Sequence, residues 1–333
     1  MEVKINMPKY VELDVHKQTC HATVINERGA IIKQKKFLNR PKELEKFFDD
    51  IEDAKVAMEA GYCWQPVYER LENKGYEVRL AHPFKTRIIA DAKIKTDASD
   101  SEALAQLLKL DWLPTSYVPT GEIRELRELV RLHVYLVRER TRFKNKVRAE
   151  MSKRRIEIAG DPFTKRRRSQ LKEAENRAID NYLEIVVSLD ERIKELEREL
   201  KVRAQENEEA KLLMTIPGVG YFSALAILAE IGDIDRFPDA EKLCSYAGMV
   251  PSLHQSGATM KSGRITKQGS ALLRWILVEC AWMHIRNAGD TRLTRFFYRI
   301  SKRKGRAIAI TATARKLLVA IYWMLKRREE FRA

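Results

Sequence analysis

The succession of apolar runs in the first 118 residues leaves very few folds open to this chain. Three strand-like runs come first, with a hairpin turn at 26–29 between the second and the third; they span 11–15, 21–25 and 31–37. A helix, a strand, a second helix and another strand follow, at 41–52, 56–58, 65–73 and 76–80. Three antiparallel strands followed by alternating helices and strands are the order of a ribonuclease-H-like α/β fold, which we therefore expect here.

Two of these strands end in a carboxylate, and an acidic cluster follows them. Asp14 ends the first strand and Glu59 ends the fourth, and this fold would place the two strand ends side by side. Asp97 and Asp100 are three residues apart at the start of a helix, so they share a face. Two magnesium ions need converging oxygen ligands to clamp the attacking and leaving oxygens of a phosphodiester. The four carboxylates therefore predict phosphate chemistry at a site for two Mg²⁺ ions.

Other carboxylates are close enough in sequence to replace members of this set. Asp91 and Glu102 flank the Asp-x-x-Asp pair, and Glu12 shares a strand face with Asp14. We prefer Asp14 to Glu12 because Asp14 is nearer the end of the strand, where such sites open.

The charge of the chain indicates its partner. Lys and Arg number 63 against 47 Asp and Glu, which gives a formal net charge of +16. Such an excess favours a polyanion, because each Lys or Arg that contacts a phosphate releases condensed counterions. No apolar run reaches 18 residues and the chain does not begin like a signal peptide, so we expect a cytoplasmic protein with no membrane partner. The four cysteines are far apart, which argues against zinc and against a disulfide framework.

Residues 119–208 are expected to form long, charged helices. An apolar stripe from Tyr182 to Leu200 repeats at close to 3.5 residues over about three heptads. Such a stripe is compatible with an antiparallel hairpin within the chain and with a coiled coil between chains. A basic run at the turn between the long helices is interpreted as a phosphate contact rather than a solvated charge run; it comprises Lys165, Arg166, Arg167 and Arg168.

Residues 209–333 are expected to form a mainly helical domain. Pro217-Gly218-Val219-Gly220 between two apolar helices is the pattern of a helix-hairpin-helix. Gly218 and Gly220 allow a tight turn whose N–H groups, at the positive end of the next helix, receive a phosphate. A plain helical corner is the alternative.

A polar, glycine-punctuated loop at 251–270 is the most unusual stretch of this domain. Arg264, Lys267 and Arg274 are suited to neutralising a phosphate and stabilising a pentacovalent transition state. From the residue types alone, phosphate binding by this loop is favoured over covalent catalysis.

These motifs together resemble the DEDD transposases of insertion sequences, which are bridge-RNA-guided recombinases. The likeness rests on the four carboxylates, the turn at 216–220, the segment at 229–233 and the run from Ser256-Gly257 to Gly263-Arg-Ile-Thr-Lys-Gln-Gly269. These occur in the right order over nearly the whole chain, and the last run is the most specific. The resemblance implies a RuvC-like domain at 1–118, a coiled-coil region at 119–208 and a transposase domain at 209–333.

The resemblance also implies a covalent mechanism. It identifies Ser256 as the nucleophile, with Ser262 as the main competitor and Ser252 as a lesser one. The serine would attack the scissile phosphodiester and form a phosphoserine, activated by the carboxylate-bound Mg²⁺. The expected partners are donor and target DNA and a structured guide RNA that pairs with both, in a prokaryotic protein that associates with the nucleoid when acting.

The carboxylates and the serine fall in different domains. We therefore expect a homo-oligomer, a dimer or a tetramer, in which the carboxylates of one protomer face the serine of another. Two other functions are compatible with the residues. One is a metal-dependent, structure-specific endonuclease of the junction-resolvase kind, in which Ser256 is inert, and the other is a non-catalytic nucleic-acid-binding scaffold. Tyr298 could in principle be the nucleophile of a tyrosine recombinase, but the set of Arg and His residues that this chemistry needs is not recognisable around it.

Overall fold

The computed structural model describes residues 8–83, 85–86, 97–172, 175–256 and 259–332, and of residues 97–102, 172, 253–256 and 259–262 it describes the backbone alone. The chain divides into two compact units, Met1–Val118 and Pro119–Ala333.

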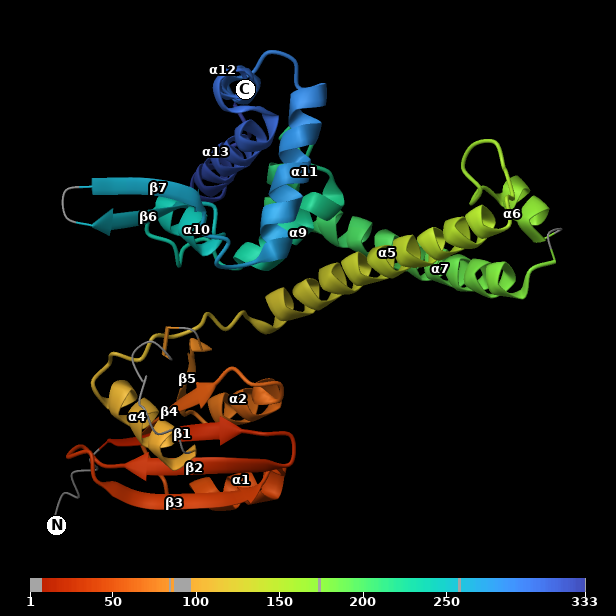
Figure 1. Ribbon diagram of the computed structural model, residues 1–333. Helices are drawn as coiled ribbons and strands as arrows, with labels where there is room; N and C mark the ends of the chain where they lie inside the picture. Colours follow the sequence, from red (N-terminus) through yellow and green to blue (C-terminus); the bar gives the residue numbers. More distant parts are fainter. Residues whose placement is uncertain (1–7, 84, 87–96, 173–174, 257–258, 333) are drawn as a thin grey trace, which may run out of the picture. The chain divides into compact units, whose positions relative to one another are not determined.

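The first unit is a five-stranded sheet with helices on both faces (Figure 1). Its strands are β1 (Lys9–Val15), β2 (Thr19–Ile25), β3 (Ile31–Leu38), β4 (Ala54–Glu59) and β5 (Glu77–Ala81). Their order is β3-β2-β1-β4-β5; β2 is antiparallel to β1 and β3, whereas β4 is parallel to β1 and β5. Every strand that the sequence predicts is present, and β1 and β4 are neighbours as expected.

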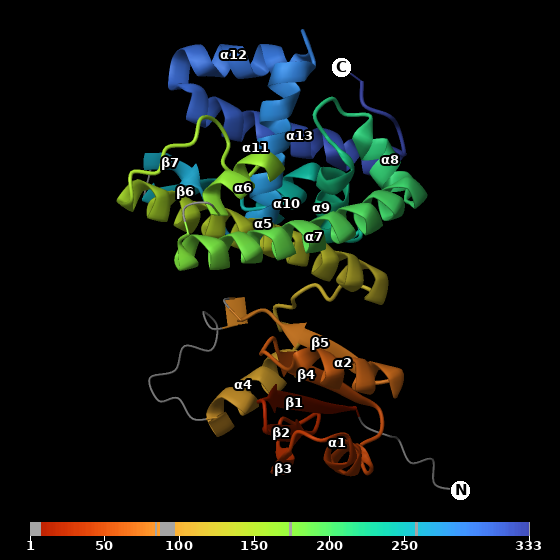
Figure 2. The same cartoon turned by 90° about the vertical axis from the view of Figure 1, so that its right-hand side faces the viewer.

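The alternation of side chains along the strands decides which helix covers which face. Val11, Leu13 and Val15 are buried against α1 (Pro41–Phe48) and α2 (Trp64–Asn73). The opposite face, which includes Tyr10 and Ala57, packs against α4 (Asp97–Lys109) (Figure 2). Helix α1 ends at Phe48 rather than at residue 52, because the chain turns back there into β4 through Asp53, whose φ is +47°.

The second unit begins with two long helices that pack against each other, α5 (Gly121–Lys153) and α7 (Arg177–Glu206), with the short α6 (Lys165–Lys172) between them in sequence. His133 pairs with Glu197 and Arg140 with Asp190, so α5 and α7 are antiparallel. Of the two arrangements open to the apolar stripe, the structure has the hairpin within the chain. The hairpin does not bury the whole stripe, and Tyr182, Leu189 and Leu196 remain half-buried.

The remaining helices of the second unit share one hydrophobic core with the base of this hairpin, through Val130 and Leu200. They are α8 (Glu208–Met214), α9 (Tyr221–Ile231), α10 (Ala240–Tyr246), α11 (Ala271–Asn287), α12 (Arg292–Lys304) and α13 (Arg306–Arg327). A two-stranded ribbon of β6 (Pro251–Ser256) and β7 (Thr259–Ile265) lies between α10 and α11 in sequence.

Helix α13 is long and apolar, although no uninterrupted apolar run of 18 residues occurs in it. Within the part of the chain that the structure describes, it is the one helix long and apolar enough to cross a membrane, with a mean hydropathy of 1.5 over 18 residues. Just over half of that window, 56%, is buried inside the unit, and Leu317, Leu318 and Ile321 are completely inaccessible. Its apolar composition is therefore that of a core helix.

Candidate active site

The carboxylates at the strand ends are brought together by the pairing of β1 with β4. The register pairs Leu13 with Met58, so the next residues, Asp14 and Glu59, lie side by side where both parallel strands end. Both belong to the sheet face that α4 covers, because Leu13 and Met58 point into the core beneath α1 and α2. The end of the sheet therefore presents two acidic groups on one face.

The surroundings of Asp14 favour it over the neighbouring Glu12. The Asp14 side chain is 24% exposed and lies 3.0 Å from Nε2 of His16. Glu12 belongs to the same face but is 1% exposed. From the sequence, His16 is not expected to be a ligand, and the structure places its ring beside Asp14, just beyond the end of β1.

The thiol nearest to Asp14 is not a reactive one. Cys20 pairs with Val15 across the β1–β2 ladder and is buried. Burial, with smaller effects of the charge of Asp14 and of Cys63, raises the pKa of Cys20 to about 11. The thiol is therefore protonated at neutral pH, which makes it a poor nucleophile and a poor metal ligand.

Helix α4 carries the other two predicted carboxylates in its first turn, Asp97 and Asp100. Near the other end of α4, Nε2 of Gln106 donates to the carbonyl of Gly29, in the β2–β3 turn. That turn lies beside the start of β1, so α4 runs back along the sheet toward the strand ends. Along α4, the nine residue steps from Gln106 back to Asp97 span about 13 Å, and along β1 the four steps from Tyr10 to Asp14 span about the same length. The first turn of α4 is thus directed toward the end of the sheet that carries Asp14 and Glu59.

The donor set fits a hard divalent cation. Carboxylate oxygens are the ligands that Mg²⁺ prefers; Asp14 and Glu59 lie on the sheet face that α4 covers, and Asp97 and Asp100 lie on α4 itself. Among the side chains that the structure describes, no three His, Cys, Asp or Glu residues are grouped closely enough to hold a metal ion. Asp97, Asp100 and Glu102 are described by their backbone alone, and Asp91 lies outside the described residues.

The predicted nucleophile lies at the tip of the β6–β7 ribbon, a segment that the sequence analysis treats as a loop. Ser256 is the last residue of β6 and pairs with Thr259, whereas Ser262 pairs with Leu253. By this register, Ser256 and Ser262 belong to opposite faces of the ribbon. Ser252 lies near the base, where its hydroxyl packs against Gly263.

The base of the ribbon is held by backbone contacts that only glycine permits. Gly248 and Gly269 have φ values of +66° and +118°, and a Cβ on either would collide with backbone of the adjoining segment. Lys267 N–H donates to the carbonyl of Gly248 at 3.0 Å. The guanidinium of Arg274 donates to the carbonyls of Ala247 and Gly269 at 3.0 and 3.1 Å, and burial lowers its pKa.

The three cations that are predicted to bind phosphate in this segment differ in their surroundings. Arg274 is half-buried and holds the ribbon in place, whereas Arg264 and Lys267 are exposed. Gly248 is not predicted to have a role from the sequence, where the one signal is a glycine shortly before the strand.

The turn at Pro217–Gly220 packs closely on α11. Gly218 has a φ of +96°, and a Cβ there would lie 2.5 Å from the backbone nitrogen of His284. The buried His284 ring donates from Nδ1 to the carbonyl of Pro217 at 2.8 Å and accepts at Nε2 from the Thr291 hydroxyl at 2.9 Å. Burial lowers the pKa of His284, in keeping with a neutral ring. Gly220, the other predicted phosphate contact, is exposed and precedes α9 without a side-chain cap.

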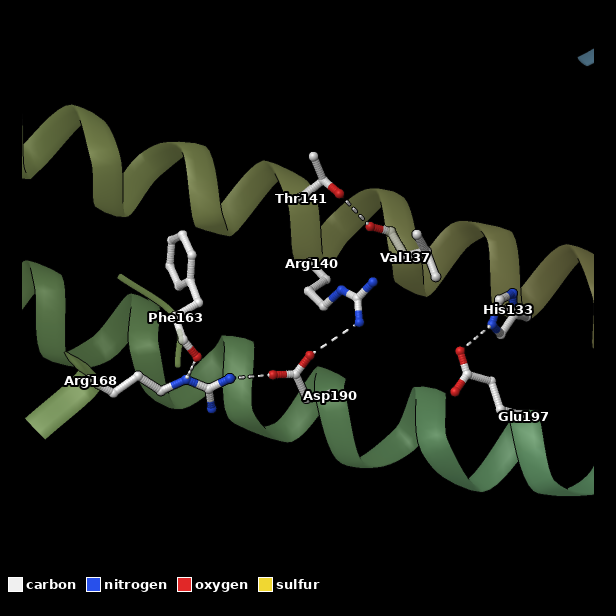
Figure 3. A network of polar contacts seen from close by, with 8 residues as sticks. All are labelled: His133, Val137, Arg140, Thr141, Phe163, Arg168, Asp190 and Glu197. Atoms are coloured by element: carbon white, nitrogen blue, oxygen red, sulfur yellow. Dashed lines mark hydrogen bonds and ion pairs between the residues drawn. The ribbon is translucent and has the colours of Figure 1, made fainter. Parts of the chain in front are cut away.

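The basic run at 165–168 begins helix α6 rather than forming the turn itself, and its members differ in their surroundings. Nη2 of Arg168 lies 2.6 Å from Asp190, which also pairs with Arg140, and Nε of Arg168 donates to the carbonyl of Phe163 (Figure 3). Arg168 therefore holds the tip of the α5–α7 hairpin. Lys165 and Arg166 are exposed, so these two residues are the ones of the run best placed to contact a phosphate.

Comparison with known proteins agrees with this arrangement. A family model described as a transposase of the DEDD, IS110 kind matches residues 11–153, and one described as the IS116/IS110/IS902 transposase family matches residues 210–298. The transposase of the insertion sequence IS1111A from Coxiella burnetii is 26% identical over 341 residues, which cover 97% of this chain and 91% of the relative. A probable family 20 transposase from Pseudomonas aeruginosa is 25% identical, with 96% and 97% covered. The pilin gene-inverting protein of Moraxella bovis is 32% identical over 46% of this chain and 47% of its own length.

The α/β unit with acidic strand ends and the helical unit with the serine-bearing ribbon thus define a DNA transposase of the DEDD class. The first family match spans all four predicted carboxylates, and the second spans Ser256. The chain belongs to the IS110/IS116/IS902 family of insertion-sequence transposases.

Proposed function

We propose that this transposase is an RNA-guided recombinase that cuts and rejoins DNA through a phosphoserine at Ser256. The observation that carries the proposal is the register of β1 with β4, which sets Asp14 beside Glu59 on the sheet face toward which the first turn of α4 is directed. An arrangement of this kind is suited to phosphodiester chemistry and has no evident use in a passive scaffold.

The four carboxylates would hold the divalent cation, most simply as two Mg²⁺ ions per site. When bound there, the cation would act as a Lewis acid on the scissile phosphate. Asp14 and Glu59 would supply oxygen ligands from the sheet, and Asp97 and Asp100 would supply them from α4. His16, at 3.0 Å from Asp14, would orient that carboxylate from the outer side.

The serine would conserve the energy of the broken bond. Ser256 Oγ would form a bond to phosphorus while the bond from phosphorus to the leaving DNA oxygen breaks; the hydroxyl proton goes to a base and the leaving oxygen takes up a proton. A free DNA hydroxyl then attacks the phosphoserine, which joins the strand and restores Ser256. The name of the Moraxella relative supports rejoining, because inversion of a gene requires strands to be resealed as well as cut.

The same proposal covers the architecture and the partners. The first unit would be RuvC-like, which the sheet order supports, and the remainder would comprise a coiled-coil region at 119–208 and a transposase domain at 209–333 with a helix-hairpin-helix. The net charge of +16 suits binding of donor DNA, target DNA and a guide RNA. A dimer or tetramer would let carboxylates and serine meet between protomers. The protein would act in the cytoplasm, at the nucleoid.

The test is a denaturing gel of purified protein incubated with labelled donor DNA, its co-purified RNA and Mg²⁺. The wild-type chain should form a covalent protein–DNA adduct, and Ser256→Ala should abolish the adduct and strand exchange while DNA binding persists. Ser262→Ala is the matched control, since it removes the same atom from the opposite face of the ribbon. Asp97→Asn and Asp100→Asn should each abolish cleavage and spare binding.

Each other outcome indicates a different function. Adduct in Ser256→Ala but not in Ser262→Ala would transfer the nucleophile to Ser262. Nicked DNA without any adduct in the wild type would indicate the structure-specific endonuclease, and neither product would indicate the scaffold. Absence of a discrete co-purified RNA on sequencing would refute RNA guidance.

A further inference from the structure

The most basic segment of the chain lies near its C-terminal end and is not among the predicted nucleic-acid contacts. Residues 291–328 contain 12 Lys and Arg and no Asp or Glu, in a chain whose net charge is +16. The family matches end at residue 298, so most of this segment lies outside them.

Helix α12 displays much of this charge along one side. Its buried side consists of Leu293, Thr294 and Phe297, which pack into the core of the second unit. The helix lies at the outer edge of that unit, beyond α13 (Figures 1 and 2). Cations at helical spacing follow its exposed side over about 17 Å. They are Arg292, Arg295, Arg299, Lys302 and Arg303, and Lys304 and Arg306 continue the row into the start of α13.

One of these cations pairs with a carboxylate within the described part of the protein. Asp290 pairs with Arg295 at 3.1 Å. For the other cations of the row, the described part of the chain offers no carboxylate within 4 Å. Arg299 and Arg306 lie against aromatic rings, Phe296 and Trp282, which leaves their charge intact.

Helix electrostatics account for only part of the row. Arg292 and Arg306 are the first residues of α12 and α13, and neither helix has an acidic residue in its first turn. The start of a helix is its positive end, where cations are unfavourable. Lys302, Arg303 and Lys304 do lie favourably at the end of α12. A row that is placed against the helix dipole at two of its positions is best explained by an external anion.

We propose that the exposed side of α12, with the start of α13, binds the phosphate backbone of duplex DNA. A row of cations along one side of a helix suits contacts with several phosphates of a duplex, which carries one negative charge per about 1.7 Å of its axis. The apolar side of α12 is buried, so the helix has no apolar face to insert into a membrane. An unbroken row of cations suits contacts with phosphates, which carry no sequence information, so we expect the contact to be independent of sequence. This inference rests on the transposase acting on DNA and does not depend on the serine or the guide RNA.

The experiment is a salt titration of DNA affinity. Arg299, Lys302, Arg303 and Lys304 are all exposed, and changing each to Gln should leave the fold intact, which far-UV circular dichroism checks. Affinity for a 40-base-pair duplex of arbitrary sequence is measured from low to physiological salt. The dependence of log K on log salt should become shallower by up to about 0.9 for each phosphate that the variant no longer neutralises. A reduction of about 2 to 3 is expected if most of the four residues touch phosphates.

A matched control removes the same charge from cations that already have partners. Arg142, Lys153, Arg192 and Lys211 are exposed and each pairs with a carboxylate three residues away. Changing these four to Gln should alter the salt slope by less than about one. Equal slopes for the two variants would mean that net charge alone is responsible and would overturn the proposal.

Two further binding measurements test whether the anion is RNA or a membrane surface instead of duplex DNA. If the α12 variant keeps the wild-type slope for duplex DNA but loses it for single-stranded RNA of the same length, the surface binds RNA and the proposal fails. If it loses binding to vesicles containing phosphatidylserine and keeps DNA binding, the partner is a membrane. Failure of the wild type to form a covalent adduct would count against the proposed recombinase and leave these slopes unaffected.

Discussion

The pairing of Arg131 with Glu230 offers a direct test of how the long hairpin is fastened to the helical core. Nε of Arg131 donates to Oε1 of Glu230 at 2.9 Å and Nη2 donates to Oε2 at 3.2 Å. The Glu230 side chain is 2% exposed and that of Arg131 56%. The neighbouring Arg127 donates to the carbonyl of Ala229 at 2.8 Å. Glu230 lies in the 229–233 segment on which the resemblance to DEDD transposases partly rests, so this contact gives that segment a structural role.

Arg131→Met keeps most of the side-chain stem and leaves the carboxylate of Glu230 buried without its cation. Removing one partner of a buried pair costs about 3 to 5 kcal/mol. We expect the lower end, about 3 kcal/mol, because the half-exposed position of Arg131 lets water reach the carboxylate. For a unit of this size, that loss lowers the melting temperature by roughly 6 to 12 °C.

The assay is thermal unfolding of the full chain followed by far-UV circular dichroism, which the helices of the second unit dominate. Arg142→Met is the control, since Arg142 lies on the same helix and its partner, Glu139, is 3.6 Å away at the surface. It should change stability by less than about 1 kcal/mol. The double variant Arg131→Met/Glu230→Met removes both charges and should be more stable than Arg131→Met alone. Indistinguishable melting of the two single variants would refute the reasoning.

Two further predictions concern the turn that packs on α11. Gly218→Ala should lower stability by about 1 to 3 kcal/mol, because it adds both a Cβ clash and strain at a φ of +96°. Gly289→Ala, with a φ of +64° and no atom within 4 Å of the new Cβ, isolates the strain and should cost less in urea unfolding. Burial lowers the pKa of His284 in the folded protein, so protonation favours the unfolded chain. The contribution of the neutral ring to the free energy of unfolding is complete above about pH 6.5, the ordinary pKa of histidine, and is lost as the pH falls toward the pKa of His284 in the folded protein. The urea midpoint should therefore drop from pH 7 to pH 5, with a smaller drop in His284→Gln, and equal drops would contradict this assignment.

Local patterns were sufficient for the strands of the first unit and for the long helices. Val11, Leu13 and Val15 alternate with polar residues, and alternation at period two is decided by the chain itself. The same alternation placed Asp14 on the face opposite the main core. The end of α1 was missed because it depends on where the chain must turn to enter β4, and helix boundaries are set by such tertiary demands.

Side-chain roles were harder to predict than elements. Lys165 and Arg168 look alike in the sequence, yet Arg168 is held by Asp190, a residue 22 positions away. Arg274 has the appearance of a phosphate ligand but donates to the carbonyls of Ala247 and Gly269. A cation is drawn to whichever acceptor the fold brings within reach, and that acceptor is not visible from the neighbouring sequence.

The sequence by itself determined which face of each element would turn toward a core, because that face follows the period of two or 3.6 residues that the backbone imposes. It thereby determined that Asp14 and Glu59 would lie at or next to the ends of strands, and that the stripe through Ile193 and Leu200 needed a partner. Only the tertiary structure decided that this partner is α5 of the same chain, and that Gly218 must be glycine because α11 lies against it. Those choices depend on contacts between residues far apart in the chain, whose geometry is fixed by packing of the whole unit rather than by any local pattern.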